Sequence, residues 1–183
     1  MSEETLIRHC SPTLAGIKTG NIFSCTHEST DVLRDQIRAL NRRLASRGLC
    51  ILPLRISESS ALIYVYRPSK LRADLAGADA AAVLASRGYS DAKPSRCIAT
   101  LAERLKGGDF PHEIGLFLGY PVEDVIGFIE KRECKLSGAW KVYGDEELAR
   151  RTFAKYKKCT DVYTRQHRSG KPIERLTVSR LGV

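Results

Sequence analysis

The sequence lacks the features of a membrane or secreted protein. No stretch approaches the roughly 18 apolar residues of a membrane-spanning helix. The first residues, Met1 to Glu4, contain neither the basic region nor the apolar core of a secretory signal peptide. The six cysteines include no CxxC pair, and the cytosol keeps such thiols reduced. We therefore expect a cytoplasmic protein with free thiols and no membrane contact, in which Cys50 and Cys97 are small core residues.

The motifs of several enzyme classes are also missing. The sequence contains no GxxxxGK[ST] phosphate-binding loop, no GxGxxG turn after a strand and no GxSxG nucleophile elbow. His112 and Glu113 are followed by Leu116 where a zincin protease carries its second histidine. These absences exclude the P-loop nucleotide hydrolases and the zincins. Whether the protein is an enzyme stays open.

The composition that remains is that of a soluble globular protein. The chain has 183 residues, of which 43% are hydrophobic and 28% charged, so it can bury a core without disulfides or a structural metal. We expect one α+β domain over residues 1–183, with a small antiparallel sheet packed with several helices. Two apolar, β-branched or aromatic runs predict a hairpin over 49–67, and a further strand is expected over 139–143. Leu33, Ile37, Leu40 and Leu44 at helical spacing predict a helix over 31–47 that Gly48 ends. Further helices are expected over 71–87, with a break or weakening at Gly77, and over 94–106, 121–131 and 145–167.

The net charge of +9 is concentrated near the C-terminus. Residues 1–149 contain 20 Lys/Arg and 19 Asp/Glu, whereas the basic segment 150–183 contains 10 Lys/Arg and 2 Asp/Glu. Such a segment predicts a salt-dependent anionic partner, an acidic redox protein rather than nucleic acid, although part of it also complements the dipole of a long helix. The residues expected to contact this partner are Arg150, Arg151, Lys155, Lys157, Lys158 and Arg165.

A reactive thiol is one hypothesis for the site. Ser11 suits a helix N-cap and Pro12 suits the first helical position. Cys10 would then lie beside the positive end of a helix, where a thiolate is favoured. We expect Cys10 to act as a nucleophile with His112, or with the adjacent His9, as base if the fold brings them together. The alternative is an unreactive thiol beside a helix cap.

A metal site is a second hypothesis. His9, Cys10, Cys25 and His27 place four nitrogen or sulfur donors within nineteen residues. Thiolate and imidazole suit both zinc and ferrous iron, so Fe or Zn is the cofactor class expected, with no further cofactor indicated. The spacing matches no standard zinc module.

Residues 113–126 match helix-turn-helix spacing, with Gly115, Gly119 and Val125 at the small, turn and apolar positions. The front of the would-be recognition helix carries Glu123 and Asp124, which is unfavourable beside a phosphate backbone. We therefore interpret this segment mainly as a helical hairpin in the core.

Aromatic residues lie at helical offsets along the predicted helix over 145–167. Phe153, Tyr156 and Tyr163 could stack on a nucleobase or a flavin-like ring. Core packing explains the same pattern more simply.

Several blocks of sequence together resemble a known bacterial family. They are residues 9–18 (HCSPTLAGIK), 64–67 (YVYR), 110–121 (FPHEIGLFLGYP), 140–143 (WKVY) and 153–159 (FAKYKKC). In this order they resemble the family catalogued as domain of unknown function 3793 over nearly the whole chain. The resemblance implies a cytosolic protein of anaerobic bacteria, loosely associated with ferrous-iron uptake and flavodoxin neighbours.

These observations lead to an expected function and two alternatives. We expect an accessory factor in iron or redox metabolism, with a thiol or metal site at Cys10 and a basic docking surface for an anionic partner. The alternatives are a helix-turn-helix regulator that binds DNA and a Cys-dependent enzyme.

Overall fold

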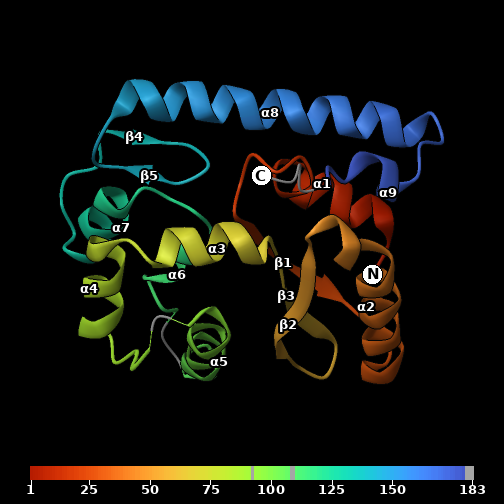
Figure 1. Ribbon diagram of the computed structural model, residues 1–183, viewed down its shortest axis with the longest axis horizontal. Helices are drawn as coiled ribbons and strands as arrows, with labels where there is room; N and C mark the ends of the chain where they lie inside the picture. Colours follow the sequence, from red (N-terminus) through yellow and green to blue (C-terminus); the bar gives the residue numbers. More distant parts are fainter. Residues whose placement is uncertain (92, 108–109, 180–183) are drawn as a thin grey trace. The chain divides into compact units, whose positions relative to one another are not determined.

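The computed structural model describes residues 1–91, 93–107 and 110–179 (Figure 1). It confirms the α+β class, with helices accompanying two small antiparallel sheets. Within the described residues, no helix is both long and apolar enough to cross a membrane. The end of the basic segment, residues 180–183, lies outside the described part of the chain.

The chain, which we expected to form one domain over residues 1–183, groups into two compact units. Unit 1 contains residues 1–69 and the chain from residue 158 onward, and unit 2 contains residues 70–157. Helix α8, Glu146–Arg168, is continuous from unit 2 into unit 1. Each unit is described by itself below.

The sheet of unit 1 contains the predicted hairpin. Strands β2, Cys50–Ile56, and β3, Ser60–Tyr66, pair antiparallel, with a bulge between Pro53 and Arg55. The third strand is β1, Gly20–Thr26, which pairs with β3 and gives the order β1-β3-β2. The expected third strand over 139–143 belongs to another sheet, because its backbone pairs locally instead of with the hairpin.

Two helices pack against the sheet of unit 1 because each has one apolar face. Helix α1, Glu3–Leu14, contacts β1, and helix α2, Thr30–Leu44, contacts β2. A short 3-10 turn follows α2, and Gly48, with a φ of 71°, ends it as predicted. The core between helices and sheet includes Leu6, Ile7, Leu14, Leu33, Ile37, Leu40, Leu44, Ile51, Ile63 and Val65.

Helix α1 begins nearly ten residues before the predicted cap. The N-cap is Ser2, whose hydroxyl accepts a hydrogen bond from the Thr5 amide at 3.2 Å. Ser11 and Pro12 therefore lie in the last turn of α1 and are not its start, and the Ser11 hydroxyl donates to the Ile7 carbonyl. Pro12 has no N–H to donate to the carbonyl one turn earlier, and α1 ends two residues after it.

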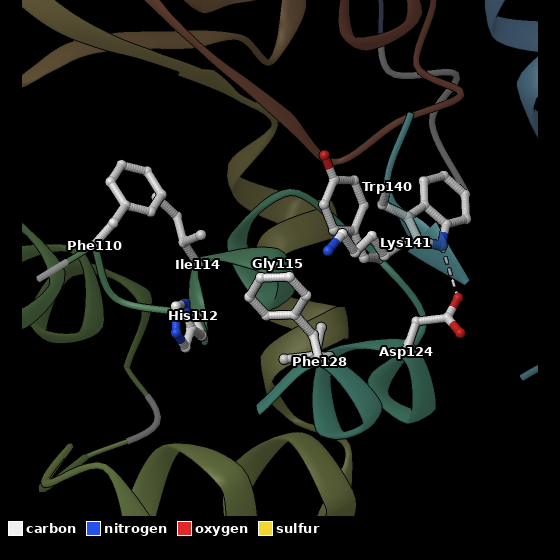
Figure 2. A pocket seen from close by; sticks show the side chains of 10 residues that line it. Phe110, His112, Ile114, Gly115, Asp124, Phe128, Trp140 and Lys141 are labelled. Atoms are coloured by element: carbon white, nitrogen blue, oxygen red, sulfur yellow. Dashed lines mark hydrogen bonds between the residues drawn. The ribbon is translucent and has the colours of Figure 1, made fainter. Parts of the chain in front are cut away.

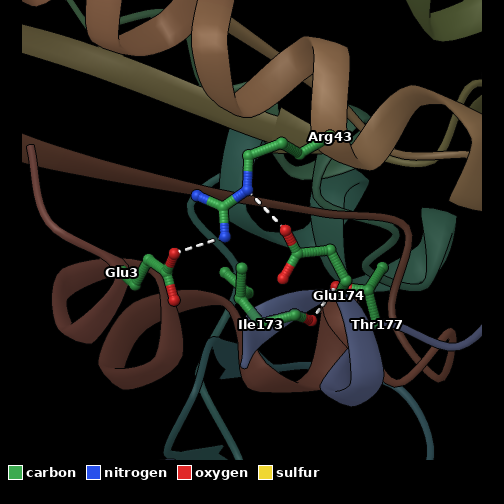
Figure 3. A network of polar contacts seen from close by, with 5 residues as sticks. All are labelled: Glu3, Arg43, Ile173, Glu174 and Thr177. Atoms are coloured by element: carbon green, nitrogen blue, oxygen red, sulfur yellow. Dashed lines mark hydrogen bonds and ion pairs between the residues drawn. The ribbon is translucent and has the colours of Figure 1, made fainter. Parts of the chain in front are cut away.

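An arginine joins α1 and α2 to the short helix α9, Ile173–Leu176 (Figure 3). The Arg43 guanidinium donates to Glu3 at 2.6 Å and to Glu174. Thr177 ends α9 by donating its hydroxyl to the Ile173 carbonyl at 2.8 Å. Hydrogen bonding to Arg43 lowers the pKa of Glu174 below its ordinary value of 4.5.

We expect Glu174→Gln to lower the stability of unit 1 at neutral pH by less than about 1 kcal/mol, because the ion pair is partly exposed. A carboxylate whose pKa is lowered by folding stabilises the protein above its unfolded pKa, and this contribution is lost as the pH falls through the folded value. Urea unfolding should therefore separate the wild type from the variant at pH 7 and show the difference shrinking as the pH falls below 4.5 and through the lowered pKa of Glu174. A gap that stays constant with pH would contradict this assignment.

Unit 2 is mostly helical. The predicted break near Gly77 is confirmed, since α3, Pro68–Leu75, and α4, Ala78–Ser86, are separate helices. The chain continues through α5, Pro94–Arg104, to two shorter helices. These are α6, Ile114–Phe117, and α7, Val122–Ile129. Strands β4, Leu136–Ser137, and β5, Lys141–Val142, then form a two-stranded antiparallel sheet before α8.

Candidate functional site

A cavity of about 380 Å³ lies in unit 2 beside α6, α7 and β5. Its walls are almost entirely apolar and rich in aromatic rings. Figure 2 shows Phe110 and His112 at one end, Trp140 at the other, and Phe128 and Lys141 between them. We call this cavity the aromatic pocket, and the residues that line it are Phe110, His112, Ile114, Gly115, Tyr120, Asp124, Val125, Phe128, Trp140 and Lys141.

The inner wall of the pocket is built around the single tryptophan. The Trp140 ring stacks on Tyr120, with centroids 4.9 Å apart, and meets the Phe153 ring edge-on at 4.6 Å. Its indole N–H donates to Asp124 Oδ2 at 2.7 Å. Because the ring is held on its faces and at its polar edge, Trp140 presents a fixed surface to the pocket.

Asp124 anchors this wall from the first turn of α7. Its Oδ1 accepts hydrogen bonds from the backbone amides of Tyr143 at 2.6 Å and Gly144 at 2.8 Å, while Oδ2 accepts the bond from Trp140. The side chain is 3% exposed. Both oxygens are engaged, so Asp124 acts as a structural acceptor that links α7 to the chain after β5.

Gly115 allows α6 and α7 to approach closely beside the pocket. A Cβ atom at this position would lie 2.7 Å from Val125 Cγ2 and 3.1 Å from Tyr120 Cδ2. The small residue that suggested a helix-turn-helix therefore serves the packing of this hairpin.

The outer part of the pocket exposes aromatic rings and positive charge. Phe110 is 51% exposed and Phe128 is 36% exposed. The His112 ring meets Phe128 edge-on with centroids 4.8 Å apart, and Lys141 Nζ lies 5.5 Å from the Phe128 centroid. Asp124 is 3% exposed and both of its oxygens face donors within the protein, so Lys141 is the exposed charged group at the mouth.

The predicted thiol site has a different environment from the one we expected. Cys10 is fully buried inside α1, and burial raises the pKa of its thiol, an effect that Lys18 only partly offsets. Burial lowers the pKa of Lys18 to about 8, and its ammonium donates to the Gly20 carbonyl at 2.8 Å. Cys10 belongs to unit 1, whereas His112 lies in unit 2 at the aromatic pocket. A buried thiol of this kind is disfavoured as a nucleophile.

The four predicted metal donors are all in unit 1, and the two histidines among them contact a ring and a backbone carbonyl. His9 stacks on Phe23 with centroids 5.0 Å apart, and its pKa is lowered by burial and by Arg8. His27 Nε2 lies 3.1 Å from the Ser57 carbonyl oxygen. Nowhere in residues 1–91, 93–107 and 110–179 do three or more His, Cys, Asp or Glu side chains form a group that could hold a metal ion. Metal binding at His9, Cys10, Cys25 and His27 stays a prediction.

The other cysteines follow the expected burial only in part. Cys97 is buried as predicted, and its thiol donates to the Asp91 carbonyl at 3.0 Å. Cys50 is half-buried at the start of β2.

The residues of the predicted docking surface lie along α8 and fall into two groups. Arg150 and Arg151 each pair with a glutamate one turn earlier, Glu146 and Glu147, at 2.6 Å. These ion pairs join residues one turn apart on α8 and stabilise the helix itself. The other predicted contact residues pair with no carboxylate within the described residues; they are Lys155, Lys157, Lys158 and Arg165. Docking of an anionic partner stays a prediction.

The helix-turn-helix hypothesis gains no support from these elements. Helix α6 has four residues and α7 has eight, with Glu123 and the buried Asp124 in the first turn of α7. Phe153 and Tyr156 pack around Trp140, and Tyr163 packs against the core of unit 1, in keeping with the core-packing interpretation.

The aromatic pocket was not predicted from the sequence. From the sequence we expected residues 113–126 to form a core hairpin and Trp140 to lie in a strand. A usable signal was present, because Phe110, Tyr120, Phe128 and Trp140 fall within a short stretch of an aromatic-poor chain. Only the fold shows that these rings surround a cavity instead of filling it.

Comparison with known proteins confirms the resemblance seen in the sequence. The model of a family described as protein of unknown function (DUF3793) matches residues 6–177. Neither the curated proteins nor the solved structures give a significant match.

Proposed function

Because the chain belongs to the family DUF3793, whose description assigns no activity, we propose a function from the geometry of unit 2: the aromatic pocket binds a small organic molecule with an apolar, ring-sized body. The observation that carries this proposal is the cavity of about 380 Å³ built around the fixed Trp140 ring. Small-molecule sites typically have volumes of about 300–1,000 Å³ and mostly apolar walls with a few placed polar groups.

The exposed rings at the mouth support the same proposal. Phe110 and Phe128 keep much of their apolar surface in water, which is unfavourable for side chains of this size. A bound ring would cover both side chains and could stack or meet Phe128 edge-on, as His112 does. The pocket thus has exposed apolar surface that a ligand could bury.

The charge at the mouth favours an anionic ligand over a cationic one. Lys141 is the exposed charged side chain among the lining residues, and Asp124 has both oxygens occupied. A carboxylate, phosphate or sulfonate on the ligand would gain a charge-assisted contact there. The geometry supports binding, as in a carrier or ligand sensor.

We expect Phe128→Ala to weaken the binding of α-naphthol about fivefold to tenfold, since an aromatic contact contributes roughly 1 kcal/mol or more. The sequence has one tryptophan, so proton–nitrogen NMR shows a single indole resonance, and that resonance reports on the pocket directly. Titration of the wild type should shift the Trp140 indole signal to saturation.

The matched control is Leu148→Ala, which removes an apolar side chain that is 53% exposed in unit 2 but does not line the pocket. This variant should bind α-naphthol like the wild type. The proposal is wrong if the wild type shows no saturable shift, or if both variants bind equally well.

A further inference from the structure

A second, polar cavity adjoins the aromatic pocket in unit 2. It has a volume of about 610 Å³ and shares Phe110 and His112 with the aromatic pocket. These two residues form the end of the aromatic pocket opposite Trp140 (Figure 2). We call this cavity the arginine hollow, and the residues that line it are Arg87, Arg104, Gly107, Phe110, Pro111, His112 and Glu113.

One guanidinium of the hollow is held in place by the protein. Arg104 Nε donates to Glu113 Oε1 at 2.6 Å, and Arg104 Nη1 donates to the Arg87 carbonyl at 3.3 Å. Glu113 is 1% exposed and accepts a further bond from the Tyr89 hydroxyl at 2.9 Å. This network fixes the direction of the Arg104 fork and leaves Nη2 without a hydrogen bond among the described residues.

The second guanidinium has no such partner. The Arg87 side chain is half-buried at the end of α4, and no carboxylate within the described residues pairs with it. Among the described lining residues, Glu113 offsets the charge of Arg104, and the charge of Arg87 has no such counterpart. An anion bound in the hollow would make charge-assisted hydrogen bonds with this guanidinium.

We propose that the arginine hollow binds the phosphate group of a ligand whose apolar body occupies the aromatic pocket. This inference rests on the proposed function and narrows the ligand to a phosphomonoester with a ring-sized apolar part. Phosphate fits better than carboxylate because its dianion can accept bonds from both Arg87 and the open edge of Arg104, and arginine forks match its geometry. The shared wall of Phe110 and His112 allows one molecule to reach both cavities.

The proposal is tested by comparing α-naphthyl phosphate, α-naphthoate and α-naphthol on the intact chain by calorimetry and by the Trp140 indole signal. We expect the phosphate to bind at least about tenfold more tightly than α-naphthol, with the naphthoate between them. Added salt should reduce this advantage, because the extra contacts are ionic.

Arg87→Gln should remove most of the phosphate advantage while leaving α-naphthol binding unchanged. This position is suitable because the Arg87 side chain makes no ion pair with any described residue, whereas replacing Arg104 would leave the buried Glu113 without its ion pair. The matched control is Arg72→Gln, which removes an exposed arginine of unit 2 that does not line the hollow.

The outcomes separate the two proposals. If α-naphthol binds but the phosphate binds no more tightly, or if Arg87→Gln affects neither ligand, the phosphate site is wrong and the proposed function stands. If none of the three probes shifts the Trp140 signal, the proposed function itself is wrong. If Arg72→Gln and Arg87→Gln reduce the tighter binding of α-naphthyl phosphate equally, the effect comes from the overall charge of the protein and the proposed phosphate site is wrong.

Discussion

Asp124→Ala is expected to destabilise unit 2 by about 4 kcal/mol, because it removes a buried carboxylate that accepts three hydrogen bonds. The indole N–H of Trp140 and the amides of Tyr143 and Gly144 would lose their acceptor inside the protein. Small domains are stable by only about 5–15 kcal/mol, so this loss is a large part of the total. Urea unfolding followed by Trp140 fluorescence measures it.

Two variants make the Asp124 experiment specific. Asp124→Asn keeps one carbonyl acceptor and should be intermediate, because its amide group cannot accept the remaining bonds. Glu133→Ala removes an exposed carboxylate of unit 2 and should change the unfolding free energy by less than about 0.5 kcal/mol. Equal midpoints for Asp124→Ala and Glu133→Ala would show that the Asp124 network contributes nothing to stability.

Arg67→Met is expected to destabilise unit 1 by about 3 kcal/mol or more. The Arg67 side chain is 5% exposed, and its guanidinium donates to four carbonyl groups. These belong to Thr13 at 2.7 Å, Leu14 at 2.6 Å, Val178 at 2.8 Å and Arg47 at 3.2 Å. The side chain thereby joins the end of α1, the turn after α2 and the chain after α9, and methionine cannot replace these bonds.

Hydrogen exchange locates the effect of Arg67→Met. The Val178 amide donates to the Leu14 carbonyl at 3.0 Å, and its exchange should become much faster when Arg67 no longer holds the neighbouring carbonyls. Arg42→Met removes an exposed arginine of α2 and serves as the control. Unchanged exchange at Val178 in Arg67→Met would contradict the assigned role.

Local patterns predicted a large part of the fold correctly. The α2 helix was predicted from four leucine and isoleucine residues at helical spacing, and all four are buried against the sheet. The β2–β3 hairpin was predicted from two apolar, β-branched or aromatic runs. The break between α3 and α4 was predicted from Gly77. These predictions depend on residues close together in the chain, whose spacing decides which face is apolar.

Helix α1 shows where local patterns mislead. Ser11 and Pro12 have the types of residue preferred at a helix start, and this placed Cys10 at a helix N-terminus. In the structure the apolar face of Leu6, Ile7 and Cys10 packs into the core of unit 1, so the helix continues through Pro12. Burial of that face outweighs the single hydrogen bond that proline removes, and it turns the predicted reactive thiol into a core residue.

The sequence by itself determined the α+β class, the main helices and the hairpin, because these depend on the spacing of apolar residues close together in the chain. It also determined the family and the uneven charge, which are read directly from the order and type of the residues. Only the tertiary structure decided which side chains form the candidate sites. Asp124 meets Trp140 across 16 positions of the chain, and Arg67 meets Val178 across 111. Such contacts depend on how distant segments pack, and their packing also decides that the rings of residues 110–141 surround a cavity beside two arginines.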